Sequence, residues 1–223
     1  MDHSPKQDVD SPLLNQSGQA MGTKGRNTRQ RLIDATVSLL ECRPLREVRV
    51  SDIVRDAQSS VPTFYRYFRD VPEAVLAAVA ALPQSTPEML RVIEGWTMEN
   101  GHEQARAFVT GYIAHWDRHR VLFRVRNLAS EEGDQRFVDS RAQSIYPLLR
   151  AIAAQIERTE SRGRIPADIS ALAAAGALVA MIERVAATAH NQSHDVGMTF
   201  EGLISATAYI VAITLEGRPL PTG

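Results

Sequence analysis

Hydrophobic residues recur every three or four positions along most of the chain, from about residue 27 to residue 216. This spacing is typical of amphipathic helices, and no stretch of useful length alternates as a β-strand would. Proline, glycine and asparagine interrupt the pattern and separate the expected helices. The sequence therefore predicts an all-α fold with helices at 27–43, 52–57, 61–68, from 71 onward, 88–99, 103–118, 120–130, 134–160, 167–190 and 198–216.

Three cap residues mark the starts of the short helices near the N-terminus. Ser51, Ser60 and Asp70 are each of a residue type that accepts backbone N–H groups at the beginning of a helix. Pro62 falls in the first turn of the third helix, where its missing N–H group costs nothing. Residues 27–69 are therefore expected to form a helix, a short helix, a turn and another short helix.

The remaining composition narrows the class of protein. The first 25 residues lack hydrophobic periodicity and are expected to form a disordered tail, which leaves open whether Met1 or Met21 is the true start. The single cysteine, Cys42, excludes an intramolecular disulfide and suits a reducing compartment. The longest apolar stretches, Ile169–Ile182 and Leu203–Leu215, are shorter than the roughly 20 residues of a membrane span, and no signal peptide is visible. A cytoplasmic protein without a membrane segment is expected.

The charge of the chain is nearly balanced overall but unevenly distributed. The formal net charge is −1, whereas residues 22–71 hold 10 basic residues against 6 acidic residues. This positive segment coincides with the expected helix, short helix, turn and short helix. DNA-binding proteins use that arrangement to place a recognition helix in the major groove, where basic side chains meet phosphates.

Residues 50–68 carry a motif that strengthens this interpretation. An Ile and an Ala lie in one short helix, and a turn and a Ser cap are followed by Thr-Phe-Tyr-Arg-Tyr-Phe. The segment resembles the helix-turn-helix of the tetracycline-repressor (TetR) family of transcriptional regulators, with Ile53, Ala57, Thr63, Phe64, Tyr65, Tyr67 and Phe68 in register. Two positions depart from that family: Gln58 replaces a glycine in the turn, and Val71 replaces a lysine that would contact a phosphate.

The resemblance implies a three-helix DNA-binding domain at residues 26–71, after a tail at 1–25. Phe64 and Phe68 share an inward face with Ile53 and Ala57 and are expected in the core. Base edges are expected to meet Ser60, Val61, Pro62 and Thr63, and phosphates to meet Ser51, Tyr65, Arg66 and Tyr67. Lys24 and Arg26 either form a flexible basic arm in a neighbouring minor groove or belong to a solvated tail.

The resemblance further implies that residues 72–223 form a helical domain that dimerises through its last two helices and encloses a small-molecule pocket. Small residues in Ala167–His190 and Ser205–Ala208 would let paired helices approach closely. The candidate pocket residues are Trp96, Phe108, Tyr112, Trp116, Phe123, Asn127, Tyr146 and Met181. An aromatic stripe at this spacing is equally consistent with plain core. Asn127 and Glu183 stand out as polar groups on apolar stretches.

The sequence thus predicts a homodimeric regulator, most often a repressor in such a family, that binds a palindromic DNA operator and is released by a hydrophobic or amphipathic effector. No cofactor, metal or enzymatic activity is expected. A metal-dependent enzyme is the weaker alternative, because His115–His119 and His190–His194 have the i, i+4 spacing of some zinc sites without a recognisable third ligand. A helical protein-interaction module that has lost DNA recognition is the other alternative, motivated by Gln58 and Val71.

Overall fold

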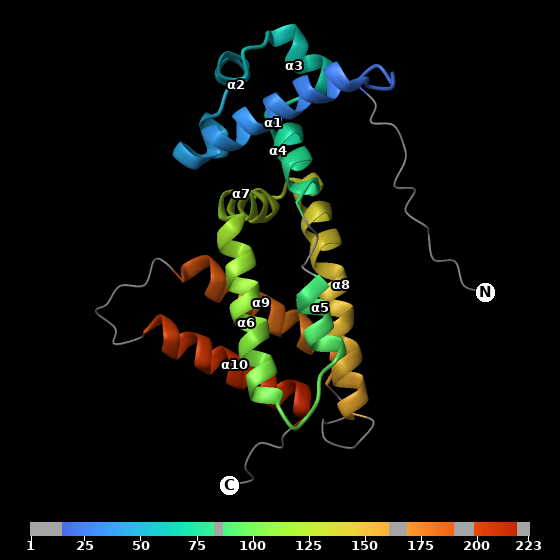
Figure 1. Cartoon of the computed structure of the whole chain (residues 1–223), viewed down its shortest axis with the longest axis vertical. Helices are drawn as coiled ribbons and strands as arrows, with labels where there is room; N and C mark the ends of the chain where they lie inside the picture. Colours follow the sequence, from blue (N-terminus) through green and yellow to red (C-terminus); the bar gives the residue numbers. More distant parts are fainter. Residues whose placement is uncertain (1–14, 83–86, 161–168, 190–198, 218–223) are drawn as a thin grey trace, which may run out of the picture. The chain divides into compact units, whose positions relative to one another are not determined.

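The computed structural model describes residues 15–82, 87–160, 169–189 and 199–217. Helices dominate all four segments, and the described residues contain no strand, so the predicted all-α fold is confirmed (Figure 1). The helices are α1 (Thr23–Cys42), the 3-10 helix η1 (Leu45–Glu47), α2 (Val50–Asp56), α3 (Val61–Tyr67), α4 (Val71–Ala80), α5 (Pro87–Glu94), α6 (Gly101–Arg118), α7 (Arg120–Glu131), α8 (Gln135–Glu160), α9 (Ala171–Thr188) and α10 (Phe200–Glu216).

Helix α5 is shorter than the pattern predicted, because it ends at Glu94 rather than near residue 99. The side chain of Gln104 fixes the loop that follows. Its Oε1 accepts the backbone N–H of Thr97 at 3.0 Å, and its Nε2 donates to the carbonyl of Gly95 at 3.3 Å. These bonds replace the helical bonds that the last turn would have made.

The chain divides into two compact units between Leu82 and Pro83, later than the predicted domain boundary at residue 71. In the first unit, α1 packs against α2, α3 and α4. The buried side chains of Leu32, Ile53 and Phe64 form the centre of this small core. Burial of such side chains is the main favourable term available to a unit of this size.

The caps of the short helices agree with two of the three predictions. The Ser60 hydroxyl accepts the N–H of Thr63 at 3.4 Å, and the Asp70 carboxylate accepts the N–H of Glu73 at 2.8 Å. The prediction for Ser51 is wrong: α2 begins at Val50 and its N-cap is Arg49, so Ser51 lies inside the first helical turn. The extended backbone of Arg49 lets its carbonyl accept the N–H groups of the first turn without a side-chain cap.

Gln58 closes helix α2 in a left-handed conformation, with φ of 49°. Its N–H donates to the Arg55 carbonyl at 3.2 Å, and the N–H of Ser59 donates to the Val54 carbonyl at 2.8 Å. This pair of bonds is the Schellman arrangement, in which glycine is the usual left-handed residue. Gln58 therefore keeps the turn that the family's glycine makes and carries the backbone strain itself.

Replacing Gln58 with glycine should raise the free energy of unfolding by about 0.5–1 kcal/mol. Glycine removes the left-handed strain, and its larger entropy loss on folding offsets part of that gain. Urea denaturation of the two proteins measures the change. Gln58→Ala is the matched control, because alanine meets the same strain and should stay near the wild-type value. Equal stability of the glycine and alanine variants would show that the turn is not strained.

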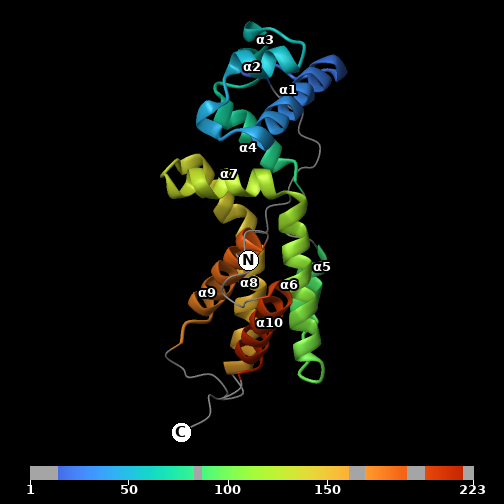
Figure 2. The ribbon, with the colours of Figure 1, turned by 90° about the vertical axis from the view of Figure 1, so that its left-hand side faces the viewer.

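In the second unit, α6 lies against α9 and α10, while α8 packs on α5, α7 and α9 (Figure 2). Its core holds the fully buried side chains of Phe108, Phe137, Ile152, Ile182 and Leu215. The close packing of these large apolar groups fixes the positions of the polar residues in this unit.

Helix α9 is the one described helix that is long and apolar enough to cross a membrane. Its apolar side chains are partly enclosed, because Leu178, Val179 and Ile182 are buried against neighbouring helices. It also contains the buried carboxylate of Glu183. The core helix of a water-soluble domain meets the same test of length and hydropathy.

Candidate nucleic-acid interface and effector-domain core

Helix α3 presents one face to the core and the other to solvent. Phe64 and Phe68 are buried, with ring centroids 5.5 Å apart, whereas Tyr65 is 51 % exposed and Val61 is 43 % exposed. The Tyr65 ring meets the edge of Phe64 at 5.6 Å, which holds the tyrosine at the base of an outward-facing surface. The short helix is therefore anchored by two phenylalanines and leaves its other side free for a partner.

The four residues predicted to meet base edges gather at the start of α3. Ser60, Val61 and Pro62 are exposed, and Thr63 is half-buried. The hydroxyl oxygens of Ser60 and Thr63 lie 2.8 Å apart and share one hydrogen bond. Each hydroxyl keeps a further lone pair, so the cap does not exhaust the hydrogen-bonding capacity of this end of the helix.

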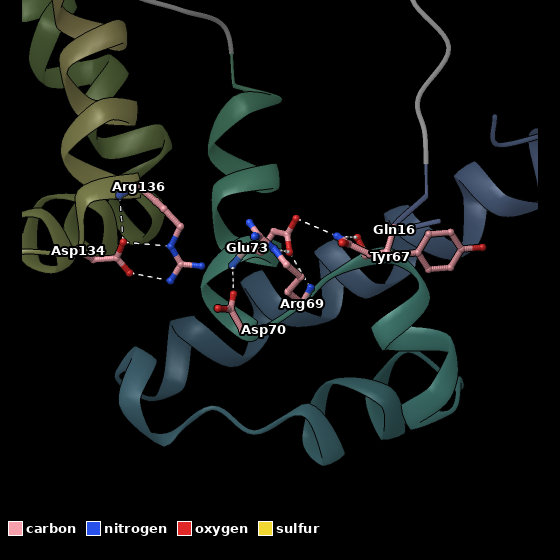
Figure 3. Close-up of polar contacts among 7 residues, drawn as sticks. All are labelled: Gln16, Tyr67, Arg69, Asp70, Glu73, Asp134 and Arg136. Carbon is pink, nitrogen blue, oxygen red and sulfur yellow. Dashed lines mark hydrogen bonds and ion pairs between the residues drawn. The ribbon is translucent and has the colours of Figure 1, made fainter. Parts of the chain in front are cut away.

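The residues predicted to contact phosphates differ in their accessibility. Arg66 is exposed, whereas Tyr67 is half-buried, with its hydroxyl beside Gly25 of α1. Gln16 fastens the segment before α1 to this corner: its Nε2 donates to the Tyr67 carbonyl at 3.3 Å and to the Glu73 carboxylate at 3.0 Å (Figure 3). Tyr67 thus contributes more to the internal structure than the exposed Tyr65.

Ser51 and Tyr65 line one open hollow of about 570 Å³, although they lie on different helices. Three arginines that the sequence interpretation did not select also line it: Arg46, Arg49 and Arg69. Arg69 bonds to Glu73 at 3.2 Å, and Arg46 lies 3.7 Å from Glu47, so part of this charge is balanced locally. Their convergence gives the hollow guanidinium donors of the kind that bind phosphate, although the Asp70 carboxylate lines it as well. The distribution of basic residues along the sequence did not by itself predict that these arginines line one hollow.

Lys24 and Arg26 do not form a flexible arm, which corrects the predicted geometry. Both lie in the first turns of α1, which begins at Thr23. An Arg26 Nη1 donates to the Met21 carbonyl at 3.1 Å. The helix extends beyond its amphipathic part because backbone hydrogen bonds continue through polar residues, and hydrophobic periodicity gives no sign of that extension.

The predicted pocket residues do not form one site. Trp96, Phe108, Trp116 and Phe123 are buried, and Tyr112, Asn127 and Met181 are half-buried. Tyr146 is 58 % exposed, so its assignment to a pocket wall is wrong: its position on α8 faces solvent. The Trp116 and Phe123 rings lie 5.4 Å apart, whereas Trp96 lies in the loop before α6, beside Gly101. Only part of the predicted set is therefore brought together.

A buried ion cluster joins α7, α8 and α9 close to Tyr112. Arg126 and Glu183 are almost fully buried, with Nη2 and Oε1 3.8 Å apart, and Arg141 makes a short ion pair with the same carboxylate. Asn127 donates to Glu183 at 3.5 Å and accepts from Arg126 Nε at 3.0 Å. Glu183, which the sequence marked as unusual, is thus the carboxylate shared by this cluster.

Burial dominates the electrostatics of the cluster. It lowers the pKa of Arg126 from its ordinary value, and the Glu183 carboxylate partly opposes that effect. It raises the pKa of Tyr112, and Glu183 adds to the rise. Tyr112 is therefore a neutral hydroxyl at ordinary pH, next to two arginines that share one carboxylate.

The His115–His119 pair has no third metal ligand among the residues that the structure describes. The His115 and His119 rings lie 5.2 Å apart at the end of α6, and the residues that the structure describes contain no group of three or more potential ligands from His, Cys, Asp and Glu. His190 and His194 lie outside the described residues.

Comparison with known proteins identifies two regions of the chain. Residues 32–71 match the family described as "Bacterial regulatory proteins, tetR family", and residues 89–221 match "Tetracyclin repressor-like, C-terminal domain". No curated protein matches the chain significantly.

Solved structures with the same fold include a putative TetR-family regulator from Syntrophomonas wolfei, with TM-score 0.58 and 14 % identity, covering 89 % of this chain and 99 % of that one. The fatty acid degradation regulator FadR from Bacillus halodurans has TM-score 0.57 and 14 % identity, covering 87 % and 97 %. A putative TetR-family regulator from Rhodococcus sp. has TM-score 0.54 and 16 % identity, covering 85 % and 99 %. The C-terminal match alone spans more than half of the chain, so this protein belongs to the TetR family of transcriptional regulators.

Proposed function

We propose that this regulator is a cytoplasmic homodimer that represses transcription from a palindromic operator and is released by a small hydrophobic or amphipathic effector. The observation that carries the DNA-binding part is the exposed side of α3, which holds Val61 and Tyr65 over buried Phe64 and Phe68. The first unit would bind DNA, and the second would bind the effector and dimerise.

On the DNA, the start of α3 would enter the major groove. Ser60, Val61, Pro62 and Thr63 would meet base edges there, with the apolar pair suited to a thymine methyl. Tyr65, Ser51 and Arg66 would hold phosphates, assisted by Arg46, Arg49 and Arg69 around the open hollow. Lys24, Arg26 and Tyr67 are weaker contributors, because helix and loop contacts constrain them.

Dimerisation would use the outer faces of α9 and α10. Large apolar side chains are exposed there, at Leu172 on α9 and at Tyr209 and Ile210 on α10. The same two helices also carry exposed alanines, at Ala173, Ala177, Ala180 and Ala206. Small residues let helices approach closely, and two such helices from each copy would bury the apolar groups in a four-helix interface. A two-fold protein of this kind reads a two-fold operator.

The effector would bind in the second unit and favour a dimer whose recognition helices do not match the operator spacing. Tyr112, Phe123 and Asn127 are the predicted residues that gather round the ion cluster of Arg126, Arg141 and Glu183. With two arginines for one carboxylate, this region suits an amphipathic molecule that carries an acceptor group.

Replacing Tyr65 with phenylalanine should weaken binding to all DNA sequences alike by about 0.5–1.5 kcal/mol, the worth of one net hydrogen bond. The operator is first obtained by selecting bound sequences from random duplexes, and mobility shifts at several salt concentrations then give the affinities. Log affinity should fall steeply with log salt as phosphates are neutralised.

Thr63→Ala should instead relax the preference at one base position, because it acts at the base edges.

Tyr146→Phe is the matched control, because it removes the same hydroxyl from an equally exposed tyrosine in the other unit. It should bind DNA like the wild type. If Tyr65→Phe and Thr63→Ala also bind like the wild type, the orientation proposed for α3 is wrong. If no duplex is selected at all, the protein-interaction alternative gains support over DNA binding.

A further inference from the structure

Helix α3 is only seven residues long, so it depends on its neighbours for stability. Isolated helices of this length are marginal in water, and the last carbonyl groups of any helix lack a partner within the helix. Phe64 and Phe68 hold the inward face of α3 in the core, but their side chains offer those carbonyls no hydrogen-bond donor. The backbone of Phe68, the C-cap residue, is extended, so no left-handed C-cap turn supplies the donors either.

Gln16, in the segment before α1, supplies donors to this end of α3. Its backbone N–H donates to the Arg66 carbonyl at 3.0 Å, and its side-chain Nε2 donates to the Tyr67 carbonyl at 3.3 Å. The same Nε2 donates to Glu73 Oε1, in the first turn of α4, at 3.0 Å (Figure 3). One residue therefore joins the end of α3 to the start of α4.

The Glu73 carboxylate is the acceptor shared by this corner. Its Oε2 accepts the backbone N–H of Arg69 at 2.6 Å and the Arg69 Nε at 3.2 Å. The backbone N–H of Glu73 donates to the Asp70 carboxylate at 2.8 Å. Hydrogen bonds to an ionised acceptor are stronger than those between neutral groups. The connection from α3 to α4 is thus fixed to the same carboxylate that Gln16 contacts.

A closed turn presents Gln16 for these contacts. Asn15 Oδ1 accepts the N–H of Gln19 at 2.9 Å, and the Asn15 carbonyl accepts the N–H of Gly18 at 2.9 Å. Gly18 has φ of 74°, which glycine adopts without strain. Met21, which follows the turn, is buried. Gln16 is therefore already ordered, and its bonds to α3 and α4 cost little further conformational entropy.

We propose that Gln16 is a positioning residue for the recognition helix: it clamps the end of α3 to the start of α4 and so fixes the orientation in which α3 meets DNA. A tilt at the end of this short helix also moves Ser60 and Thr63 at its start. Residues that contact a ligand need supporting contacts that hold them within about 0.5 Å. The role in DNA binding rests on the function proposed above, whereas the clamp itself does not.

Amide hydrogen exchange of the full-length protein without DNA measures the clamp. The reporter is the N–H of Phe68, which donates to the Phe64 carbonyl at 2.9 Å and exchanges when the end of α3 opens. In Gln16→Ala, this amide should exchange about three- to tenfold faster, the effect of one net hydrogen bond. The amide of Leu32, in the core part of α1, should exchange as in the wild type, because the core of the unit stays intact.

Two further substitutions at residue 16 separate the loss of a donor from the loss of a side chain. Gln16→Lys keeps N–H donors for α3 and for the Glu73 carboxylate, and should protect the reporter amide like the wild type. Gln16→Glu has no side-chain donor and places a like charge beside Glu73, so the reporter should exchange at least as fast as in Gln16→Ala. Gln30→Ala is the matched control: it removes another exposed glutamine, whose Nε2 donates within α1 to Asp34 at 2.8 Å, and should leave the reporter unchanged.

DNA binding then tests whether the clamp positions α3. Gln16→Ala should lower the affinity for the selected operator about threefold, because binding must then order α3. Its affinity for unrelated duplexes and its slope of log affinity against log salt should match the wild type, because no phosphate contact is lost. Gln30→Ala should bind both kinds of duplex like the wild type.

Four results would overturn the proposal. The reporter amide could exchange alike in Gln16→Ala and Gln30→Ala, or Gln16→Lys could exchange as fast as Gln16→Ala. The Leu32 amide could accelerate as much as the reporter, which would mean a loss of overall stability instead of a local clamp. Gln16→Ala could bind the operator like the wild type, or lose affinity for all duplexes with a shallower salt slope, as a direct phosphate contact would. If the wild type selects no duplex, the proposed function fails, while the exchange rates still decide whether Gln16 clamps α3.

Discussion

Replacing Glu183 with alanine should lower the free energy of unfolding by about 3–5 kcal/mol, the cost of leaving a buried charge without its partner. Arg126 would keep its charge at a position that is only 3 % exposed. It would also face Arg141, which now pairs with the same carboxylate, without an anion between them. Urea denaturation of the wild type and the variant, followed by circular dichroism, measures this loss.

Glu201→Ala is the matched control for this substitution. It also removes a carboxylate from an ion pair with an arginine, Arg106, in the same unit, but Glu201 is 67 % exposed. Exposed pairs contribute about 0–1 kcal/mol because water screens and solvates both charges. A loss in Glu183→Ala no larger than in Glu201→Ala would show that Arg126 finds water or another partner.

A double variant separates the cost of the unpaired charge from the value of the pair. Arg126→Met combined with Glu183→Leu removes both buried charges and keeps apolar volume in their place. Buried ion pairs replaced in this way often cost little or even add stability, because the desolvation of both ions is avoided. The double variant should therefore recover most of the stability that Glu183→Ala loses. Stability would then not be the reason to retain the cluster.

Local signals in the sequence predicted most of the fold. Hydrophobic periodicity located the helices of both units, and Ser60 and Asp70 cap α3 and α4 as their residue types indicate. These features depend on neighbours within one or two helical turns, so the chain displays them directly. The cap predicted at Ser51 was wrong, and the start of α1 at Thr23 was missed. At both places the first helical bonds are backbone bonds, for which no side chain is diagnostic.

The candidate sites depend on which helix faces meet, and periodicity does not determine this. Glu183 was recognisable as a polar residue on an apolar helix, but its partners Arg126 and Arg141 belong to α7 and α8. Tyr146 carries the same aromatic signal as Phe123, yet the first is exposed and the second is buried. Only the three-dimensional structure therefore shows which residues pair across helices.

The contact between Gly101 and Glu216 shows the same limit, because it joins the start of α6 to the end of α10. Gly101 opens α6, whose N-cap residue makes no side-chain cap bond. The Glu216 carboxylate, at the end of α10 and only 2 % exposed, lies beside this helix N-terminus instead. The positive end of the helix dipole favours a carboxylate in that place. A Cβ atom on residue 101 would lie 1.7 Å from Glu216 Oε1 and 2.8 Å from its Cδ, so only glycine leaves room for it.

Gly101→Ala should therefore lower the free energy of unfolding by about 1–3 kcal/mol, the usual cost of overfilling a packed site, because the carboxylate must move away from the helix. Gly111→Ala makes the same change in the same helix where the new Cβ meets nothing, and should raise stability by about 0.5–1 kcal/mol. The opposite signs separate steric conflict from helix propensity, and urea denaturation of both variants measures them. Adding Glu216→Ala to Gly101→Ala should cost less than it does in the wild type, because the conflict is then already relieved. Two glycine variants that shift stability in the same direction would mean that the carboxylate leaves without penalty and that α6 needs no anion at its start.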